Sequence, residues 1–336
     1  MRAIVASRYG PPEVLQCEDV GTPTPADGEV LLAVRAAAVN PADRLFEAPW
    51  PVMRLATGLR RPKDPRVGSD VSGVVESVGR AVTRFAPGDA VFGVCRGALA
   101  EYACAAEAAL VDKPREVTFE AAAAAPVAGL TALQGLRDRA RMRRGDEVLI
   151  NGAAGGVGTF AVQIARALGG RVTGVCSARN VELVRSIGAE RVIDYAREDF
   201  TRDDRRYDVV LDCVGNVSLS ACRRVLTPHG RCVLVGAPPA LFAVLGRLLG
   251  ALALSPLSSR KLVPFVARVR TADLATLRDL MASGELRPVI GRRYALAEAP
   301  AAFRELDTKH ARGKLVVAVT DAPTAAIPRL VHEATT

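Results

Sequence analysis

Paired cysteines, histidines and aromatic residues are all scarce in this chain of 336 residues. No two of its seven cysteines form a C-x-x-C pair and their number is odd, which argues against a disulfide framework and a zinc-finger-type site. Aromatic residues make up 4% of the chain, whereas single-stranded nucleic acids are usually bound on aromatic stacking platforms. We therefore expect neither a disulfide-stapled fold nor a nucleic-acid-binding protein.

Lysine is also rare, because the basic residues comprise 40 arginines and only 5 lysines. The net charge is +9, but short blocks such as Arg60-Arg61 are scattered, which suits an enzyme with an anionic cofactor. The longest apolar stretch, 237–259, is interrupted by Arg247, so no membrane span is predicted. The N-terminal residues are typical of a strand rather than a signal peptide, and a cytoplasmic location is expected.

The first part of the chain is rich in short strands punctuated by glycine and proline. Strands are expected at 29–36, 73–79 and 90–93, with Pro87-Gly88-Asp89 as a turn. Many short strands of this kind indicate a small barrel-like β domain. We assign residues 1–122 to this domain, and Thr118 is a candidate N-cap for the helical stretch that follows.

From residue 146 the pattern becomes strand, glycine turn and helix, repeated. Buried-strand runs are expected at 147–151, 171–176, 192–195, 207–212 and 231–236. Strands that alternate with helices indicate a doubly wound parallel sheet, so the fold class is α/β. Residues 123–270 form the predicted dinucleotide-binding domain, 271–320 return to the first domain, and 321–336 are expected to be a mobile tail.

The strongest chemical motif is the glycine-rich stretch 152–158 between a predicted strand and a predicted helix. Gly155 would make the sharp turn, Gly156 would admit a pyrophosphate, and Gly158 would let the helix pack closely. A helix that begins here directs its N-terminus at the anion. The alternative is an ordinary glycine-rich turn.

In such a domain, residues at the end of the second strand bind the 2′ group of the cofactor's adenosine ribose, which is a hydroxyl in NAD and a phosphate in NADP(H). An acidic residue there holds a 2′-hydroxyl, but residues 176–180 contain none. Ser177 and Arg179 offer a hydroxyl and a guanidinium instead, which favour the 2′-phosphate of NADP(H). Arg179 could alternatively be a solvated residue at a helix start.

Zinc catalysis would need ligands in the first domain, and the sequence offers few. All three histidines (His229, His310 and His332) come after the glycine-rich loop, and no other ligand lies at the expected spacing. Cys95 and Cys104 are expected to be small buried residues. No metal site is predicted.

Seven blocks lie in a fixed order along the chain, at 37–43, 68–75, 84–89, 130–134, the loop at Gly155, 176–180 and 311–314. Taken together, these blocks resemble the medium-chain dehydrogenase/reductase superfamily. Within it, the chain is most similar to the zinc-independent quinone oxidoreductase (ζ-crystallin-like) branch, near the group with the reticulon-interacting mitochondrial protein and bacterial NAD(P)-dependent alcohol dehydrogenases. The resemblance implies a GroES-like β-barrel catalytic domain plus a Rossmann domain. Zinc-using relatives carry a cysteine in the block that corresponds to 40–43. They carry a His-Glu pair where this chain has Ser69-Asp70.

The resemblance also implies roles for individual residues. Asn40 and Asp43 would lie near the nicotinamide and the substrate, and Thr131 near the nicotinamide and its ribose. These three are the candidate catalytic residues; alternatively, Asn40 and Asp43 cap local turns. The implied cofactor-binding set is Asn40, Thr131, Ala154, Gly155, Gly156, Val157, Ser177, Arg179, Tyr195, Val214, Gly215, Val235, Gly236 and Lys314.

One position departs from the family pattern. Many relatives have a tyrosine where this chain has Leu45, so Arg44, Trp50 or water would have to supply the proton donor. Tyr195 could also be only a strand aromatic.

We expect an NADPH-dependent reductase of quinones or of the activated C=C bond of α,β-unsaturated carbonyls. Two alternatives remain: an NADP-dependent alcohol/ketone oxidoreductase, and a low-turnover NADPH-binding interaction protein suggested by the apolar segment 238–257. The partners expected are a small-molecule substrate and, from the resemblance, a second copy of the chain in a homodimer that pairs through a strand near 262–269.

Overall fold

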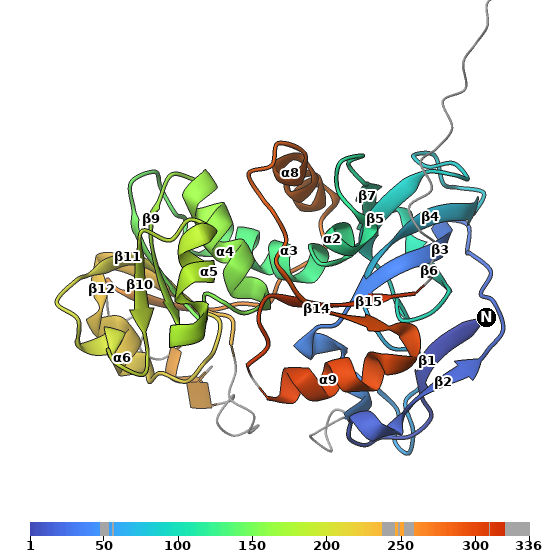
Figure 1. Cartoon of the computed structure of the whole chain (residues 1–336), viewed down its shortest axis with the longest axis horizontal. Coiled ribbons are helices and arrows are strands. Elements are labelled where there is room, and N and C mark those ends of the chain that lie inside the picture. The colour runs from blue at the N-terminus through green and yellow to red at the C-terminus, as the bar shows by residue number, and fades with distance from the viewer. Residues whose placement is uncertain are drawn as a thin grey trace, which may run out of the picture.

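The computed structural model has two lobes, each built around a β-sheet, with helices packed between them (Figure 1). It describes residues 1–47, 54–55, 57–236, 246–247, 249–251, 259–308 and 310–319. The predicted tail 321–336 and most of the apolar segment 238–257 lie outside these residues.

The dinucleotide-type lobe contains a six-stranded parallel sheet in the order β10-β9-β8-β11-β12-β13. This is the 3-2-1-4-5-6 order of a Rossmann sheet, and it confirms the predicted fold class. The order reverses between β8 and β11, where such sheets bind ligands. The strands are β8 (Glu147–Asn151), β9 (Arg171–Cys176), β10 (Arg191–Asp194), β11 (Tyr207–Asp212), β12 (Leu226–Leu234) and β13 (Lys261–Pro264).

Helices flank this sheet in the manner of an α/β fold (Figure 1). They are α4 (Gly156–Ala167), α5 (Val181–Ser186) and α6 (Leu219–Arg224). The apolar side chains of α4, including Phe160, Val162 and Ile164, are buried in a cluster with Val148 and Ile150 of β8. This burial holds the start of α4 at the carboxyl end of β8.

The other lobe is the GroES-like one, and the C-terminal part of the chain contributes to its sheet. The path is β14-β15-β3-β4-β5-β7, with β6 also paired to β3, and β1 pairs separately with β2. The strands are β1 (Arg2–Ala6), β2 (Leu15–Asp19), β3 (Glu29–Ala38), β4 (Asp70–Val78), β5 (Ala90–Val94), β6 (Tyr102–Ala106), β7 (Leu110–Asp112), β14 (Ile290–Ala295) and β15 (Lys314–Ala318).

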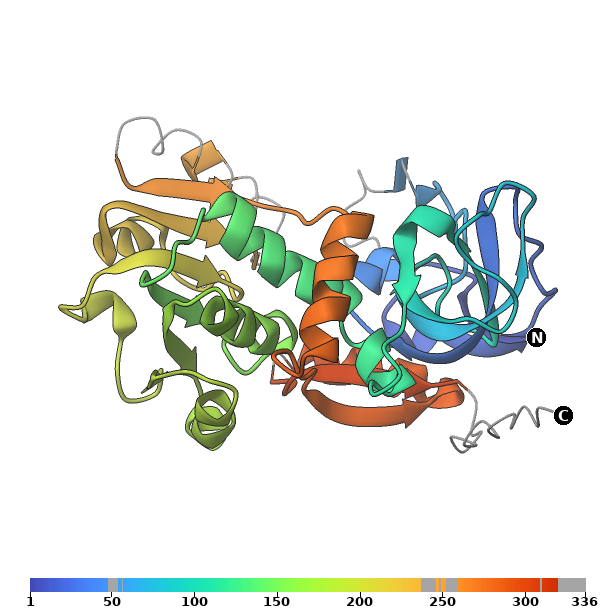
Figure 2. The ribbon, with the colours of Figure 1, turned by 90° about the horizontal axis from the view of Figure 1, so that it is seen from above.

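Three helices lie between or beside the lobes (Figures 1 and 2), namely α2 (Phe119–Ala123), α3 (Pro126–Gln134) and α8 (Thr271–Ala282), while α9 (Ala299–Asp307) packs in the GroES-like lobe. The Thr118 hydroxyl caps α2 by accepting from the Ala121 amide at 3.2 Å, as predicted. The first helix of the expected return, α8, buries Leu274 and Leu277 in the same cluster as α3. The two lobes thus share an apolar core at this junction.

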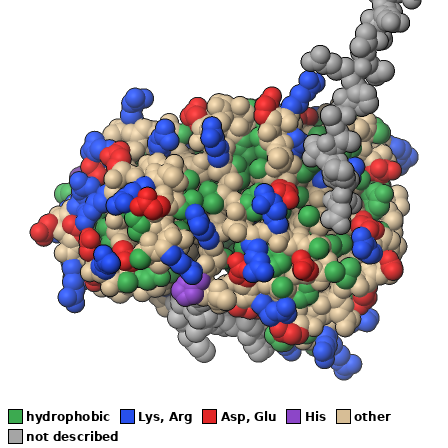
Figure 3. All heavy atoms as spheres, in the orientation of Figure 1, with side chains coloured by type: hydrophobic (Ala, Val, Ile, Leu, Met, Phe, Trp, Pro, Cys, Tyr) green, Lys and Arg blue, Asp and Glu red, His purple; other side chains and the backbone are tan. Residues whose placement is uncertain are grey.

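Within the described ranges, no helix combines the length and apolarity needed to cross a bilayer. On the face shown in Figure 3, basic and acidic side chains are interspersed.

Candidate active site

Three buried polar side chains meet where the neighbouring strands β15, β3 and β4 of the GroES-like sheet begin or end, beside the glycine-rich loop. The Lys314 ammonium lies 3.0 Å from Asp70 Oδ2 and donates to Asn40 Oδ1 at 2.5 Å. Asn40 Nδ2 donates to Asp70 Oδ2 at 2.9 Å. They meet because β3, which ends at Ala38, pairs with both β4 and β15. Each side chain is at most 4% exposed, so the charges neutralise each other away from water.

Asp43 joins this group through Ser69. The Ser69 hydroxyl donates to Asp43 Oδ1 at 2.6 Å, and the Asn40 amide donates to Asp43 Oδ2 at 2.8 Å. Burial raises the pKa of Asp43 to about 6, and repulsion from Asp70 acts in the same direction against the Ser69 hydrogen bond and the Lys314 charge. A carboxyl group that titrates near neutrality can both give and accept a proton.

Helix α3 is docked on the same cluster by its first turn. The Val127 amide donates to Asp70 Oδ1 at 2.9 Å. Thr131, one turn later, donates its hydroxyl to the Val127 carbonyl at 2.7 Å and is buried. Asp70 therefore positions the helix that carries Thr131.

The glycine-rich loop has the shape of a phosphate-binding turn, but its sharp turn is not at the expected glycine. Gly152 has φ +84°, whereas Gly155 is extended (φ −81°, ψ 179°). A Cβ on Gly158 would lie 2.1 Å from the Gly152 carbonyl oxygen, so only glycine lets α4 begin so close to the loop. The first amides of α4 lack partners within the helix, which suits a pyrophosphate.

The loop and the polar cluster are joined by residues 313 and 314. The Gly313 amide donates to the Ala154 carbonyl at 2.8 Å. A Cβ on Gly156 would lie 3.3 Å from Lys314 Cδ, so the stem of this lysine runs beside the loop. Residues 313 and 314 thus connect the loop, at Ala154 and Gly156, to the polar cluster, at Asn40.

The loops after β11 and β12 meet beside the same turn. Asp212 accepts from the amides of Val214 and Gly215 at 3.2 and 3.0 Å and from Asn151 Nδ2 at 2.9 Å. Its backbone carbonyl accepts from Val235 and Gly236 at 3.0 and 2.8 Å. Val214, Gly215, Val235 and Gly236 therefore lie together at the carboxyl edge of the sheet, as a cofactor-lining role requires.

The candidate 2′-phosphate residues lie at the ends of β9 and β10. Ser177 accepts from Asn180 Nδ2 at 3.1 Å, and Tyr195, which is 55% exposed, donates its amide to the Cys176 carbonyl at 3.1 Å. Arg179 is exposed and donates to the His310 carbonyl at 3.1 Å. No carboxylate is paired with Arg179 among the described residues, so its charge is available to an anion.

Comparison with known proteins agrees with this geometry. Residues 26–115 match the family model for the alcohol dehydrogenase GroES-like domain, and 187–317 match that for zinc-binding dehydrogenase. A chloroplast envelope quinone oxidoreductase homolog of Arabidopsis thaliana is 33% identical over 94% of this chain and 98% of its own length. The chain belongs to the quinone oxidoreductase branch of the medium-chain dehydrogenase/reductase superfamily. It is an oxidoreductase, and the family acts on small molecules.

Two solved members of the superfamily have the same fold. The quinone oxidoreductase of Coxiella burnetii has a TM-score of 0.83 and 32% identity over 95% of this chain and 99% of that one. The Escherichia coli quinone oxidoreductase complexed with NADPH has a TM-score of 0.80 and 26% identity over 95% and 100%. The predicted superfamily and branch are confirmed.

The structure also places several other residues that the sequence singles out. Arg44, a candidate donor, forms ion pairs with Glu47 at 2.7 Å and with Asp307. The Leu45 side chain and Trp50 lie outside the described part of the chain. The Lys314 ammonium contacts Asn40 and Asp70, while the stem of the side chain runs beside the loop. Cys95 is buried as expected, but Cys104 is only partly so.

The sequence reasoning missed the two residues that organise the cluster. In the sequence, Ser69 and Asp70 stand out only because zinc-using relatives differ there, and no pattern marks Gly313 as a link to the loop. An ionisable residue at the start of a buried strand, as at Asp70, is a usable signal, because buried charges need partners. Among the described residues, no three potential metal-binding side chains gather at one place.

Proposed function

We propose that this protein is a zinc-independent, NADPH-dependent reductase of quinones or of the activated C=C bond of α,β-unsaturated carbonyls. The observation that carries the proposal is the link from the glycine-rich loop through Gly313 and Lys314 to Asn40 and Asp43. That link holds a proton-active carboxyl group beside a site shaped for a dinucleotide.

The residues of the loop fit a dinucleotide. The glycines leave room for a pyrophosphate, and Arg179 with Ser177 replaces the acidic residue that would select NAD. The relative from Escherichia coli, which was solved as a complex with NADPH, supports the same preference. When bound, the nicotinamide supplies a hydride, and the protein positions it and stabilises charge.

Ser69 and Asp43 would complete the reduction by moving a proton. After two electrons enter the substrate as a hydride, its oxygen carries negative charge. The relay would start from the protonated form of Asp43, in which Asp43 Oδ1 donates to the Ser69 oxygen 2.6 Å away, the reverse of the hydrogen bond made by the ionised carboxylate. The Ser69 hydroxyl then gives its proton to the substrate oxygen, and the Asp43 proton replaces it. Asn40 holds Asp43 in place through its backbone amide. The carboxylate left at Asp43 is reprotonated from solvent.

The positions that hold zinc ligands in relatives contribute no histidine or cysteine here. Residues 40–43 and Ser69-Asp70 offer amide, hydroxyl and carboxylate groups, of which the Asn40 and Asp70 groups are engaged with Lys314. A donor set of this kind supports hydrogen-bond stabilisation of the oxyanion, where one donor is typically worth about 3 kcal/mol.

A substrate panel tests the proposal. Purified protein and NADPH are mixed with 9,10-phenanthrenequinone, 1,4-benzoquinone and 2-alkenals, and absorbance at 340 nm is followed; decay with at least one class is expected. Oxidation of an alcohol panel with NADP⁺, without reductase activity, would instead support an alcohol/ketone oxidoreductase. Tight NADPH binding without turnover would support the interaction protein. A homodimer and a cytoplasmic location remain part of the proposal, and sedimentation tests the first.

A further inference from the structure

A loop of the GroES-like lobe, residues 57–63, is built to a fixed shape. The Tyr9 hydroxyl contacts the Thr57 hydroxyl at 2.8 Å and donates to the Gly58 carbonyl at 2.6 Å. The Lys63 amide donates to the Thr57 carbonyl at 2.7 Å, which joins the two ends of the loop. Gly58 has φ +124°, and a Cβ there would lie 2.1 Å from the Arg61 carbonyl oxygen, so the turn requires glycine.

This loop carries positive charge that no acid among the described residues neutralises. Arg60, Arg61 and Lys63 have no carboxylate within ion-pair distance in the part of the chain that the structure describes. The adjacent acid, Asp64, is held instead by the guanidinium of Arg66 in two hydrogen bonds of 2.9 and 2.8 Å. Arginines elsewhere, such as Arg137 and Arg191, are paired with carboxylates.

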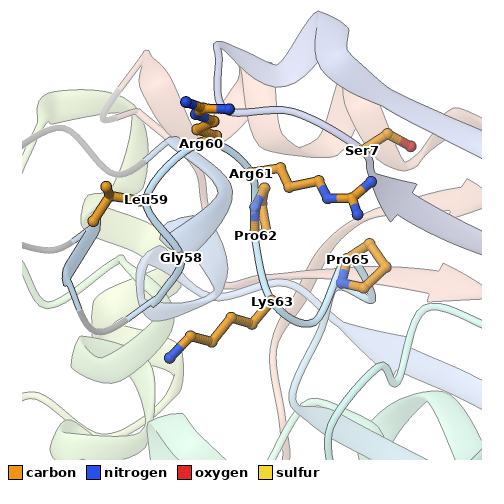
Figure 4. Close-up of a pocket in the computed structure, with 8 residues that line it drawn as sticks. All are labelled: Ser7, Gly58, Leu59, Arg60, Arg61, Pro62, Lys63 and Pro65. Atoms are coloured by element: carbon orange, nitrogen blue, oxygen red, sulfur yellow. The ribbon is translucent and has the colours of Figure 1, made fainter.

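The cations line a hollow of about 710 Å³ but do not converge on one point. In Figure 4, Arg61 reaches toward Ser7, while Arg60 and Lys63 leave the loop in different directions. A cradle for a single anion would direct its donors inward. Spread cations suit a surface on which negative charge is itself spread out.

Two leucine side chains next to these cations are exposed to solvent. Leu55 and Leu59 are each 69% exposed. Arg54 lies over the Tyr9 ring at 4.8 Å, so the segment before the loop is attached to the same anchor. We call Arg54, Leu55, Leu59, Arg60, Arg61 and Lys63 the basic-apolar rim. Exposed leucines beside unpaired cations are the composition of surfaces that lie on membranes.

We propose that the basic-apolar rim docks the protein on the surface of an anionic phospholipid bilayer. The cations would contact lipid phosphates, and Leu55 and Leu59 would enter the boundary between headgroups and acyl chains. The benefit for catalysis rests on the proposed function, because quinones with apolar side chains partition into lipid. The docking itself requires only the charges and the leucines.

Vesicle co-sedimentation tests this docking at low ionic strength. The full chain is mixed with phosphatidylcholine vesicles and with vesicles that contain phosphatidylglycerol as well. We expect binding to the anionic vesicles only, weakened by salt. Arg60→Gln/Arg61→Gln should lower the partition coefficient roughly 25-fold, at about fivefold per cation. The matched control, Arg143→Gln/Arg144→Gln, removes the same charge from another exposed pair and should bind like the wild type.

The apolar contribution has its own matched pair. Leu59→Ser should weaken binding severalfold, whereas Leu249→Ser, at a leucine that is 65% exposed, should not. Equal loss in the rim and control variants would overturn the proposal, since binding would then follow only the net charge. Thermal stabilisation by inorganic phosphate, lost in Arg60→Gln/Arg61→Gln and without vesicle binding, would also overturn it in favour of a free-phosphate site.

The two proposals fail separately. Vesicle binding without reduction of any quinone would remove the proposed function and leave the docking surface. Reduction of water-soluble 1,4-benzoquinone without vesicle binding would do the reverse. The rim variants should keep the wild-type rate with 1,4-benzoquinone in the absence of lipid, which shows that they are folded.

Discussion

At the scale of single residues, the Asp43 carboxyl group is the clearest source of pH dependence. Its pKa of about 6 means that it is largely protonated below this pH and ionised above it. If it restores the Ser69 proton, kcat/KM should fall as the pH rises through about 6. Asp43→Asn should lose this inflection and most of the activity, as measured by initial rates from pH 5 to 8. Asp27→Asn, at an exposed ion pair, is the control.

The raised pKa of Asp43 also makes the free energy of unfolding depend on pH. Because the folded-state pKa lies above the ordinary value of 3.8, the unfolded chain ionises first as the pH rises. The free energy of unfolding should therefore fall between about pH 4 and pH 6 through this group, and Asp43→Asn should reduce that slope. An unchanged slope and an unchanged activity profile in the variant would contradict the assignment.

Lys314 and Asp70 form the ion pair on which the cluster depends. Lys314→Met leaves a fully buried carboxylate without its counter-charge, which typically costs at least about 3 kcal/mol. Urea unfolding should show this loss, and the double variant Lys314→Met/Asp70→Asn should recover part of it. If the double variant is as unstable as the sum of the two single variants, the pair is not coupled as described.

Arg179 is the residue on which cofactor choice depends. A charge-assisted hydrogen bond is worth about 1.5–3 kcal/mol, so Arg179→Gln should raise the KM for NADPH roughly tenfold or more. The KM for NADH should hardly change. Arg185→Gln, at an arginine already paired with Glu182, should leave both constants near wild type. Equal losses with both cofactors would show that Arg179 does not read the 2′-phosphate.

At the scale of elements, the close start of α4 against the turn after β8 can be tested with one methyl group. Gly158→Ala places a Cβ 2.1 Å from the Gly152 carbonyl oxygen, so the helix must move. We expect lower stability and at least tenfold weaker NADPH binding by fluorescence titration. Gly28→Ala, where a Cβ meets nothing within 4 Å, is the control. Wild-type NADPH affinity in Gly158→Ala would contradict the proposed phosphate site.

Elements with a strong local pattern could be predicted from sequence. The runs at 147–151, 171–176 and 207–212 are strands with the predicted bounds, because each is an apolar run closed by a turn. In contrast, β14 carries two exposed arginines and β7 has only three residues, so neither has a readable period. The helical stretch after Thr118 divides into α2 and α3 where Pro126 interrupts it.

At the scale of the whole molecule, the site is made by contacts between residues far apart in the chain. Lys314 and Asp70 are 244 positions apart, and Gly313 meets Ala154 from the other lobe. The glycine-rich loop was readable because its motif is local. The Lys314–Asp70–Asn40 contacts were not, because they arise only when β15 joins the sheet of β3 and β4.

The most direct test of the central claim measures NADPH and quinone together. Under anaerobic conditions, the loss of NADPH at 340 nm and the formation of hydroquinone from 9,10-phenanthrenequinone are recorded in one reaction. We expect turnover with one NADPH consumed per quinone reduced, and a much higher kcat/KM with NADPH than with NADH. No decay at 340 nm with any quinone or 2-alkenal, from protein that binds NADPH, would contradict it.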